Sequence, residues 1–379
     1  MSNSIFSKVN FIKINSDNER SIKLFDEFSK CAFPSSTQEN YKFSKIPSID
    51  FSSFSQIKKT SEDQQIDITN KKEVKISNNS QISNSLTSYD FLSNAVDCFS
   101  LENNNVEINA DSNVSIVIKD KLSYSYLSKS TFIIRPNSNL TLIEYVSNAP
   151  NKKIFYGKKT KFLLEEDSQV NYIQIENLDL GSVYYHDLDF QLNGQNSQSN
   201  SFQCHFANSI SKVNINHHLN APATQSINKA AFLLDNSGHF DLETNAFHHS
   251  IKTKSDIVVK GALKNKSSSF YKGLIKIDKG AKGTDSFLQD RVIHLDKNVS
   301  SNSIPSLKID ENDVRASHGA TVSKLNEESL FYINSRGIDK TDAQRIVVEG
   351  YLNEVINSIP DKTALEFSSN LLKEKLQNK

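Results

Sequence analysis

The sequence contains no tryptophan, a single methionine and only three cysteines among its 379 residues. The cysteines, Cys31, Cys98 and Cys204, are far apart and form no Cys-x-x-Cys pair. An odd set of scattered thiols predicts neither a disulfide framework nor a local zinc or four-thiolate iron–sulfur site. We therefore expect a cytoplasmic protein with reduced thiols.

Neither sign of charge is in excess, because Lys plus Arg and Asp plus Glu both number 44. This balance argues against a nucleic acid or an anionic membrane as partner. The sequence has no stretch of about 18 apolar residues, which argues against a membrane span. Its polar N-terminus also lacks the apolar segment of a secretory signal, so we expect none.

Common catalytic and nucleotide-binding motifs are missing as well. The nearest approach to a phosphate-binding loop is the stretch YGKKTKF, Tyr156 to Phe162, and Lys152 stands upstream of it where the first glycine should be. There is no Gly-x-Ser-x-Gly and no His-Glu-x-x-His. These absences argue against an ATP site, a hydrolase nucleophile and a zinc protease centre.

The pattern of the chain divides it into three regions. Residues 1–85 are polar and irregular, with one amphipathic helix expected from Glu19 to Cys31 and a loose linker from Thr60 to Ser85. Residues 86–333 carry short alternating runs, and residues 334–379 show helical periodicity. We expect an N-terminal helical or irregular region, a β-helix core and a C-terminal helical domain.

The middle region repeats a strand that follows a small polar turn. The turns DSNV, NSNL and DSQV precede strands at Val114, Leu140 and Val170, which lie 26 and 30 residues apart. Alternation of this kind fits a β-sandwich as well as stacked coils. The recurrence without helices between the strands favours a solenoid, in which asparagine side chains can form ladders from coil to coil.

Two amphipathic helices are predicted at the C-terminus. The first has an apolar stripe of Ala343, Ile346, Val347, Gly350, Tyr351 and Val355, and Pro360 ends it. The second begins at the capping box TALE, Thr363 to Glu366, with Leu365, Leu371, Leu372 and Leu376 on its apolar side. Such helices can cap the last coil or dock a partner.

His318 is the most distinctive of the nine histidines. The pairs His217–His218 and His248–His249 fall in or near strands, so the two side chains of each pair should point to opposite faces. In SHGAT, by contrast, small residues flank His318 in a segment that reads as a loop, and Gly319 permits close approach of another backbone. The pattern leaves open whether this histidine is a ligand, a base or only a polar loop residue.

The segment from Pro305 to Ile338 resembles the C-terminal core of the SufB/SufD family, with Pro-x-Leu-x-Ile, Asp-Val, Ser-His-Gly-Ala-Thr, Leu-Phe-Tyr and Ser-Arg-Gly-Ile in order. DAQRIVVEGYLNEVI matches the helix that follows in the family. The segment from Asp241 to Ile277 resembles the solenoid of the family, and FPSSTQENYKF is similar to an N-terminal element, with Tyr41 where tryptophan is usual.

Two positions place the resemblance on the SufD branch. SufB-type proteins carry a cysteine about fifteen residues before the Pro-x-Leu motif and His-Glu-Ala in place of His-Gly-Ala. Here these positions are Asp290 and Gly319. A cysteine that is common in SufD two residues before the histidine is Ala316 here.

The resemblance implies a right-handed parallel β-helix with helical ends and a non-enzymatic role in iron–sulfur cluster assembly. The expected partners are a SufB-type paralogue, through the solenoid, and the SufC ATPase, through the C-terminal helices; a homodimer is possible in isolation. No cofactor is expected to bind stably, and ATP would act only through SufC. An iron ion or cluster would be shared transiently with SufB, with His318 as ligand. Because the imidazole must be neutral to bind metal, the fraction of sites that hold iron should decrease when the pH is lower than about 6.

The expected partner-interface positions are Asp290, Gly319, Ser335, Arg336, Gly337, Ile338, Ala343, Ile346, Val347 and Tyr351. Two alternatives remain. One is a SufB-like scaffold that holds the cluster itself, and the other is a β-helix polysaccharide enzyme or adhesin. The residues at positions 290 and 319 disfavour the first, and the missing signal and tryptophan disfavour the second.

Overall fold

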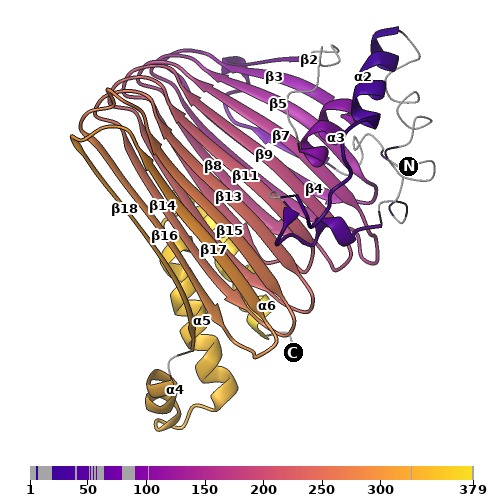
Figure 1. Ribbon diagram of the computed structural model, residues 1–379, viewed down its shortest axis with the longest axis vertical. Coiled ribbons are helices and arrows are strands. Elements are labelled where there is room, and N and C mark those ends of the chain that lie inside the picture. The colour runs from indigo at the N-terminus through magenta and orange to yellow at the C-terminus, as the bar shows by residue number, and fades with distance from the viewer. Residues whose placement is uncertain are drawn as a thin grey trace.

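The computed structural model describes residues 6, 19–38, 41–50, 52, 54, 57, 64–78, 90–100, 102–325 and 327–377. It is mainly β, with about 51% strand, and forms a solenoid of about eight turns. Figure 1 shows the coils stacked side by side, with short helices at the N-terminal end and longer helices along the C-terminal half. The solenoid expected from the repeated strands and turns is therefore confirmed.

Each coil contributes one strand to each of two parallel sheets. The first sheet contains β4 (Asn113–Leu122), β6 (Asn139–Asn148), β8 (Gln169–Asn177), β10 (Gln198–His205), β12 (Gln225–Leu234), β14 (Lys254–Leu263), β16 (Thr284–His294) and β18 (Val314–Lys324). The second contains β3 (Glu102–Ile108), β5 (Tyr126–Ile134), β7 (Phe155–Leu164), β9 (Val183–Leu192), β11 (Ile210–Leu219), β13 (His239–His248), β15 (Ser268–Ile277) and β17 (Ser300–Ile309).

The predicted polar turns hold the coils in register. Asp111, Asn137 and Asp167 have φ angles of 56°, 57° and 52°, a left-handed conformation that Asp and Asn tolerate better than most residues. The serine after each of them donates its hydroxyl to the carbonyl three residues before it. Val114, Leu140 and Val170 then stand opposite one another in β4, β6 and β8.

Side-chain amides form ladders along the outside of the coils. Asn139 donates to Asn113 at 2.7 Å, and Asn200 donates to Asn171 at 2.9 Å. Each bond joins the same position of two neighbouring coils. The high asparagine content therefore has a structural use, as the repeat pattern predicts.

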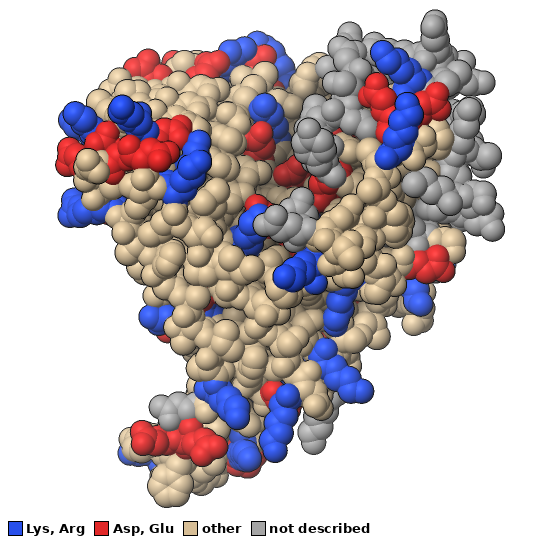
Figure 2. All heavy atoms as spheres, in the orientation of Figure 1, with Lys and Arg blue, Asp and Glu red and all other residues tan. Residues whose placement is uncertain are grey.

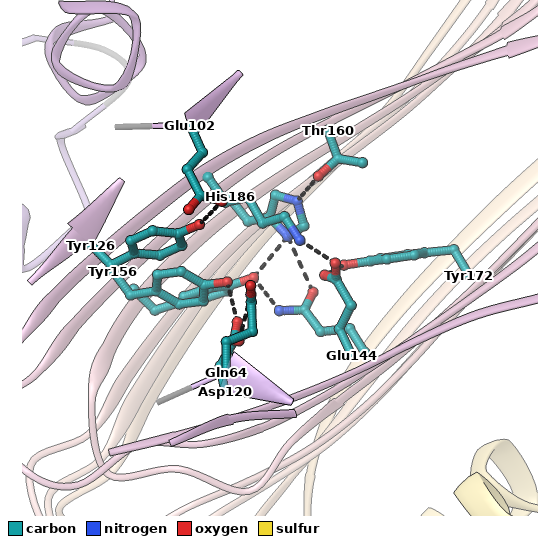
Figure 3. A network of polar contacts seen from close by, with 12 residues as sticks. Gln64, Glu102, Asp120, Tyr126, Glu144, Tyr156, Thr160, Tyr172 and His186 are labelled. Carbon is teal, nitrogen blue, oxygen red and sulfur yellow. Dashed lines mark hydrogen bonds and ion pairs between the residues drawn. The ribbon is translucent and has the colours of Figure 1, made fainter. Parts of the chain in front are cut away.

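The interior of the solenoid combines apolar stacks with a buried polar network (Figure 3). Lys158 of β7 forms an ion pair with Glu144 of β6, and Tyr172 Oη donates to the same carboxylate at 2.6 Å. His186 is bonded to Tyr184 at 2.7 Å and to Thr160 at 2.9 Å. The Lys158–Glu144 ion pair connects the two sheets across the lumen, and the other contacts hold its surroundings within each sheet.

The N-terminal end of the solenoid is capped. β1 (Gln64–Ile68) pairs antiparallel with β4, and β2 (Val74–Asn78) pairs antiparallel with β3. A 3-10 turn from Lys71 to Glu73 joins them. The prediction of a loose linker from Thr60 to Ser85 is thus wrong for its described part, because the edge of the first coil supplies the pairing that these polar strands need.

Two helices and an aromatic cluster cover the second sheet beside this cap. α2 (Glu19–Ser29) buries Leu24, Phe25 and Phe28, as its amphipathic pattern predicts. α3 (Phe91–Phe99) is fully buried and begins at the N-cap Asp90, which also accepts from Tyr41 Oη at 2.9 Å. A 3-10 turn from Ile46 to Ser48 completes the segment. Together they pack against β5, β7 and β9.

Three helices follow the solenoid: α4 (Glu327–Asn334), α5 (Lys340–Ile356) and α6 (Lys362–Gln377). α5 packs on β12 and β14 of the first sheet. Its buried residues are Ala343, Val348, Leu352, Val355 and Ile356. The predicted stripe is therefore buried only in part: Ala343 and Val355 are buried, whereas Ile346 is 44% exposed. α6 begins at Lys362, one residue before the predicted box, and the carboxylate of the preceding Asp361 accepts from the Ala364 amide at 2.8 Å.

Charge is distributed at the margins of the molecule. In the view of Figure 2, the broad strand surface is largely uncharged, whereas charged side chains of both signs gather at the turns and acidic ones gather on the projecting α4 region. Among the described residues, no helix has both the length and the hydrophobicity to cross a membrane.

Candidate functional site at the open end of the solenoid

The last coil, formed by β17 and β18, has no strand beyond it in the described chain. β17 pairs with β15 alone, and β18 pairs with β16 alone. The inward-facing Ile309 and Val322 are 40% and 46% exposed, whereas Ile277 and Val292, which stand opposite them one coil earlier, are 0% and 2% exposed. An uncovered apolar lumen and two free strand edges define an open end.

His318 lies in the middle of β18, opposite Leu288 of β16. The prediction of a loop is therefore wrong, because β16 provides a pairing partner for a sequence of small polar residues. Ala316, two residues before His318, packs on the interior cluster, and Leu288 is fully buried. Strand alternation gives His318 the same inward orientation, yet it is exposed because no coil follows.

Asp290 lies on β16 at the same end of the lumen, between Val259 of β14 and Ala320 of β18. It is 1% exposed, and neither carboxylate oxygen has a hydrogen-bond partner among the described residues. Desolvation by burial raises the pKa of Asp290 to about 6. The Ser303 hydroxyl of β17 moderates this rise in pKa, although its geometry falls short of a hydrogen bond.

Gly319 stands next to His318 on the exposed edge strand, opposite Gln289 of β16. A side chain added at this glycine would meet no atom within 4 Å. The space predicted for another backbone is therefore present. Register thus brings Asp290, His318 and Gly319 together on two adjacent strands.

The other predicted interface positions form a separate helical surface. Arg336 bonds Tyr332 Oη and lies 4.6 Å from the centre of its ring, and Gly337 has a φ of 87° in the turn before α5. Ser335 is exposed and donates to the Tyr332 carbonyl at 2.8 Å. Ile338 in this turn and Ile346 on α5 are also exposed, and Phe331 of α4 is 74% exposed.

Three of the predicted positions on α5 are buried to different degrees against the rest of the protein. Ala343 is fully buried, so it contributes to the core under α5 rather than to the accessible surface. Val347 is half-buried. Tyr351 donates to the Arg291 carbonyl at 2.7 Å, which places α5 directly behind the strand that carries Asp290.

The paired histidines behave as strand alternation predicts. His217 is buried in the lumen and stacks on Phe190 at 4.5 Å, whereas His218 stacks on Phe247 on the outer face. No group of three or more His, Cys, Asp or Glu side chains among the described residues is arranged to hold a metal ion. A metal at the open end therefore needs further ligands from water or from groups other than the described residues.

Sequence reasoning missed the polar network inside the lumen. Its members, such as Glu144, Lys158 and His186, occupy inward positions of strands that alternate like their neighbours. The available signal was a charged or polar aromatic residue at a strand position whose side chain points into the lumen. Charged residues are almost never fully buried unless they are paired, so such a position indicates a buried polar contact. The network is fully enclosed and is part of the fold.

Comparison with known proteins identifies the class. A family model described as the SUF system FeS cluster assembly, SufBD core domain, matches residues 116–351, which is more than half of the chain. The chain therefore belongs to the SufB/SufD family of iron–sulfur cluster assembly proteins.

Named relatives place it on the SufD branch. It is 26% identical over 230 residues to the iron–sulfur cluster assembly protein SufD of Bacillus subtilis, which covers 60% of this chain and 52% of that protein. It is 28% identical over 235 residues to the iron–sulfur cluster assembly protein SufD of Plasmodium berghei, and the match covers 60% of this chain and 17% of that protein. An iron–sulfur cluster assembly SufBD family protein of Synechocystis is 32% identical over 145 residues, and the match covers 38% of this chain and 30% of that protein. The matched part thus spans about half the length of the Bacillus relative and less of the others.

Proposed function

We propose that this chain is a non-enzymatic SufD-type subunit of an iron–sulfur cluster assembly complex, and that a SufB-type paralogue covers its open end. The observation that carries the proposal is the uncapped last coil, with free edges on β17 and β18 and His318 facing the lumen. Exposed edges of this kind pair with foreign strands unless they are covered. A second solenoid of the same fold has the matching edges.

Iron or a nascent cluster is the cargo of this proposed interface. The imidazole of His318 is accessible, and the chain has no thiol near it, because Cys31, Cys98 and Cys204 all lie outside the last coil. Iron accepts imidazole nitrogen together with thiolate sulfur. A thiolate from the SufB-type partner would complete the site, and the cargo would not stay bound to this chain alone.

The C-terminal helices are the proposed contact for the SufC ATPase. Phe331, Ile338 and Ile346 expose apolar surface around the α4–α5 turn. Apolar side chains concentrated on one projecting element mark a protein interaction site better than scattered ones do. ATP would then bind and be hydrolysed in the partner, in keeping with the absence of a phosphate-binding loop from this sequence.

The substitution Val322→Asp tests the solenoid interface. A carboxylate at the apolar inner edge of β18 would be buried without a partner in the complex, so we expect association with the SufB-type subunit to weaken at least tenfold. Co-purification and size-exclusion chromatography measure the effect. Ile66→Asp on β1, with a native side chain of similar exposure at 48%, is the matched control. An intact complex with Val322→Asp contradicts the proposed interface.

The substitution Ile346→Asp tests the helical contact. Removing α5 and α6 altogether would uncover the apolar strand residues Ile175, Cys204 and Leu233, so a point variant is preferable. Because Ile346 is 44% exposed, we expect normal folding but at least a tenfold loss of SufC affinity. Affinity capture with purified SufC measures it, with Ile76→Asp on β2 as control. Equal capture of both variants would remove α5 from the interface.

A further inference from the structure

Asp290 differs from the other acids of the lumen. Glu144, Glu176 and Asp120 each accept hydrogen bonds from at least two side chains. Asp290 is as deeply buried, yet both of its oxygens lack a partner within the described chain. A buried carboxylate is stabilised by a paired cation, by hydrogen bonds or by a metal, and otherwise takes up a proton, as the raised pKa of Asp290 indicates. Its surroundings therefore fit a positive charge, from a proton or a bound cation, that the described residues do not supply.

The register places this acid beside His318. Asp290 stands opposite Ala320, and His318 precedes Ala320 by two positions on the same face of β18. With strands about 4.8 Å apart and a rise of about 3.3 Å per residue, the Cβ atoms of such diagonal neighbours lie about 8 Å apart, so a carboxylate and an imidazole that point toward each other can contact one ion. On the side of the open end the residue opposite Asp290 is the small, exposed Ala320, although the Asp290 carboxylate itself is buried.

We propose that Asp290 and His318 form a divalent-cation half-site, in which Asp290 supplies a carboxylate oxygen and His318 an imidazole nitrogen. The inference rests on the proposed function, since it assigns a second ligand to the same end of the solenoid. Ferrous iron accepts both donor types. Water would fill the remaining positions in the isolated chain, and groups of the partner would replace it in the complex.

This half-site gives the missing partner of Asp290 a chemical identity. A cation bound to the carboxylate compensates the negative charge of Asp290, which burial has removed from water and placed in a low-dielectric interior. It also explains why the acid lies one coil inside the edge, where it approaches the ion from the lumen while His318 approaches from the last strand. The ion bound by the two residues would then be accessible to ligands of a partner that covers the open end of the solenoid.

Titration of the full-length chain with Co²⁺ under anaerobic conditions tests the proposal through the ligand-field absorption of the bound ion. His318→Ala defines the part of the signal that comes from the open end. We expect Asp290→Asn, which keeps the shape and removes the charge, to weaken that same component at least tenfold. The control is Asp285→Asn on the same strand, where the native acid is half-exposed and paired with Arg315; it should bind normally.

The double variant Asp290→Asn/His318→Ala makes the test independent of other surface histidines. If the two residues share one ion, the double variant should bind no more weakly than either single variant. Normal Co²⁺ binding by Asp290→Asn, or additive losses in the double variant, would overturn the half-site. Absence of any His318-dependent binding in the unmodified chain would also overturn it.

Failure of the half-site and failure of the proposed function give different results. If the half-site is wrong but the chain still serves in assembly, Asp290→Asn complexes load iron normally while His318→Ala complexes do not. If the proposed function is wrong, the unmodified chain fails to form a complex with SufB-type and SufC-type subunits, whatever its affinity for Co²⁺. Circular dichroism of Asp290→Asn excludes misfolding as the cause of lost binding.

Discussion

Replacing His318 with alanine is expected to reduce the iron content of the reconstituted assembly complex several-fold and to leave the complex itself intact. The side chain is exposed on β18 and faces the lumen at the proposed interface, so its loss removes a donor nitrogen without removing packing. Iron and acid-labile sulfide per complex, measured after anaerobic reconstitution, report the loss. Subunit ratios by quantitative gel analysis report assembly.

The matched control for this prediction is His249→Ala. His249 is also a partly exposed histidine, but it is bonded to Asp278 at 2.6 Å on the outside of the solenoid, away from the last coil. We expect normal iron loading in this variant. Normal loading with His318→Ala would instead assign His318 a structural role and would leave the cargo to the partner's residues.

Lys158→Met is expected to lower the free energy of unfolding by about 3–5 kcal/mol, the usual effect of removing one partner from a buried ion pair. Lys158 and Glu144 are 5% and 1% exposed, and their contact joins β7 to β6 across the lumen. Methionine keeps most of the apolar stem but leaves the Glu144 carboxylate with Tyr172 as its remaining hydrogen-bond donor. Urea denaturation, compared at equal m values, measures the change.

Two further variants separate charge from packing in this prediction. Lys161→Met on the same strand points to solvent and should change the free energy of unfolding by less than about 0.5 kcal/mol. The double variant Lys158→Met/Glu144→Gln removes both charges and keeps an acceptor for Tyr172, so it should recover much of the lost stability. Equal destabilisation by the single and double variants would show that lost packing, rather than an unpaired carboxylate, is responsible.

The coils were predictable from sequence because their signals are local. Asp111, Asn137 and Asp167 belong to turns whose side chains and left-handed backbone are set within a few residues. The alternation that follows assigns Val114 and Leu140 to the lumen, where the structure places them. Their consistent recurrence correctly favoured stacked coils over a sandwich.

Elements whose partners are distant in sequence were harder to predict. β1 and β2 have polar, mostly exposed sequences and form strands because the first coil offers them free edges. α5 shows the same limit, since contact with β12 and β14 decides which of its apolar faces is buried. Ile346 consequently remains at the surface, although it matches the helical period.

The candidate site was predictable in part. The motif around His318 identified the residue and the family, and the family match over residues 116–351 confirms the latter. The motif did not indicate a strand, because small polar residues are typical of turns and only the neighbouring β16 makes this segment extended. Asp290 was named from its spacing to the Pro-x-Leu motif, but its lack of a hydrogen-bond partner becomes evident only once the residues around it are known.

The sequence by itself therefore determined the repeated coil, the terminal helices and the family, because turn chemistry, periodicity and motifs are properties of short segments. Only the tertiary structure decided which end of the solenoid is covered and which is open. It also decided that Asp290 and His318 share that open end. Capping and burial depend on pairing between segments far apart in the chain, and no local pattern encodes the absence of a neighbour.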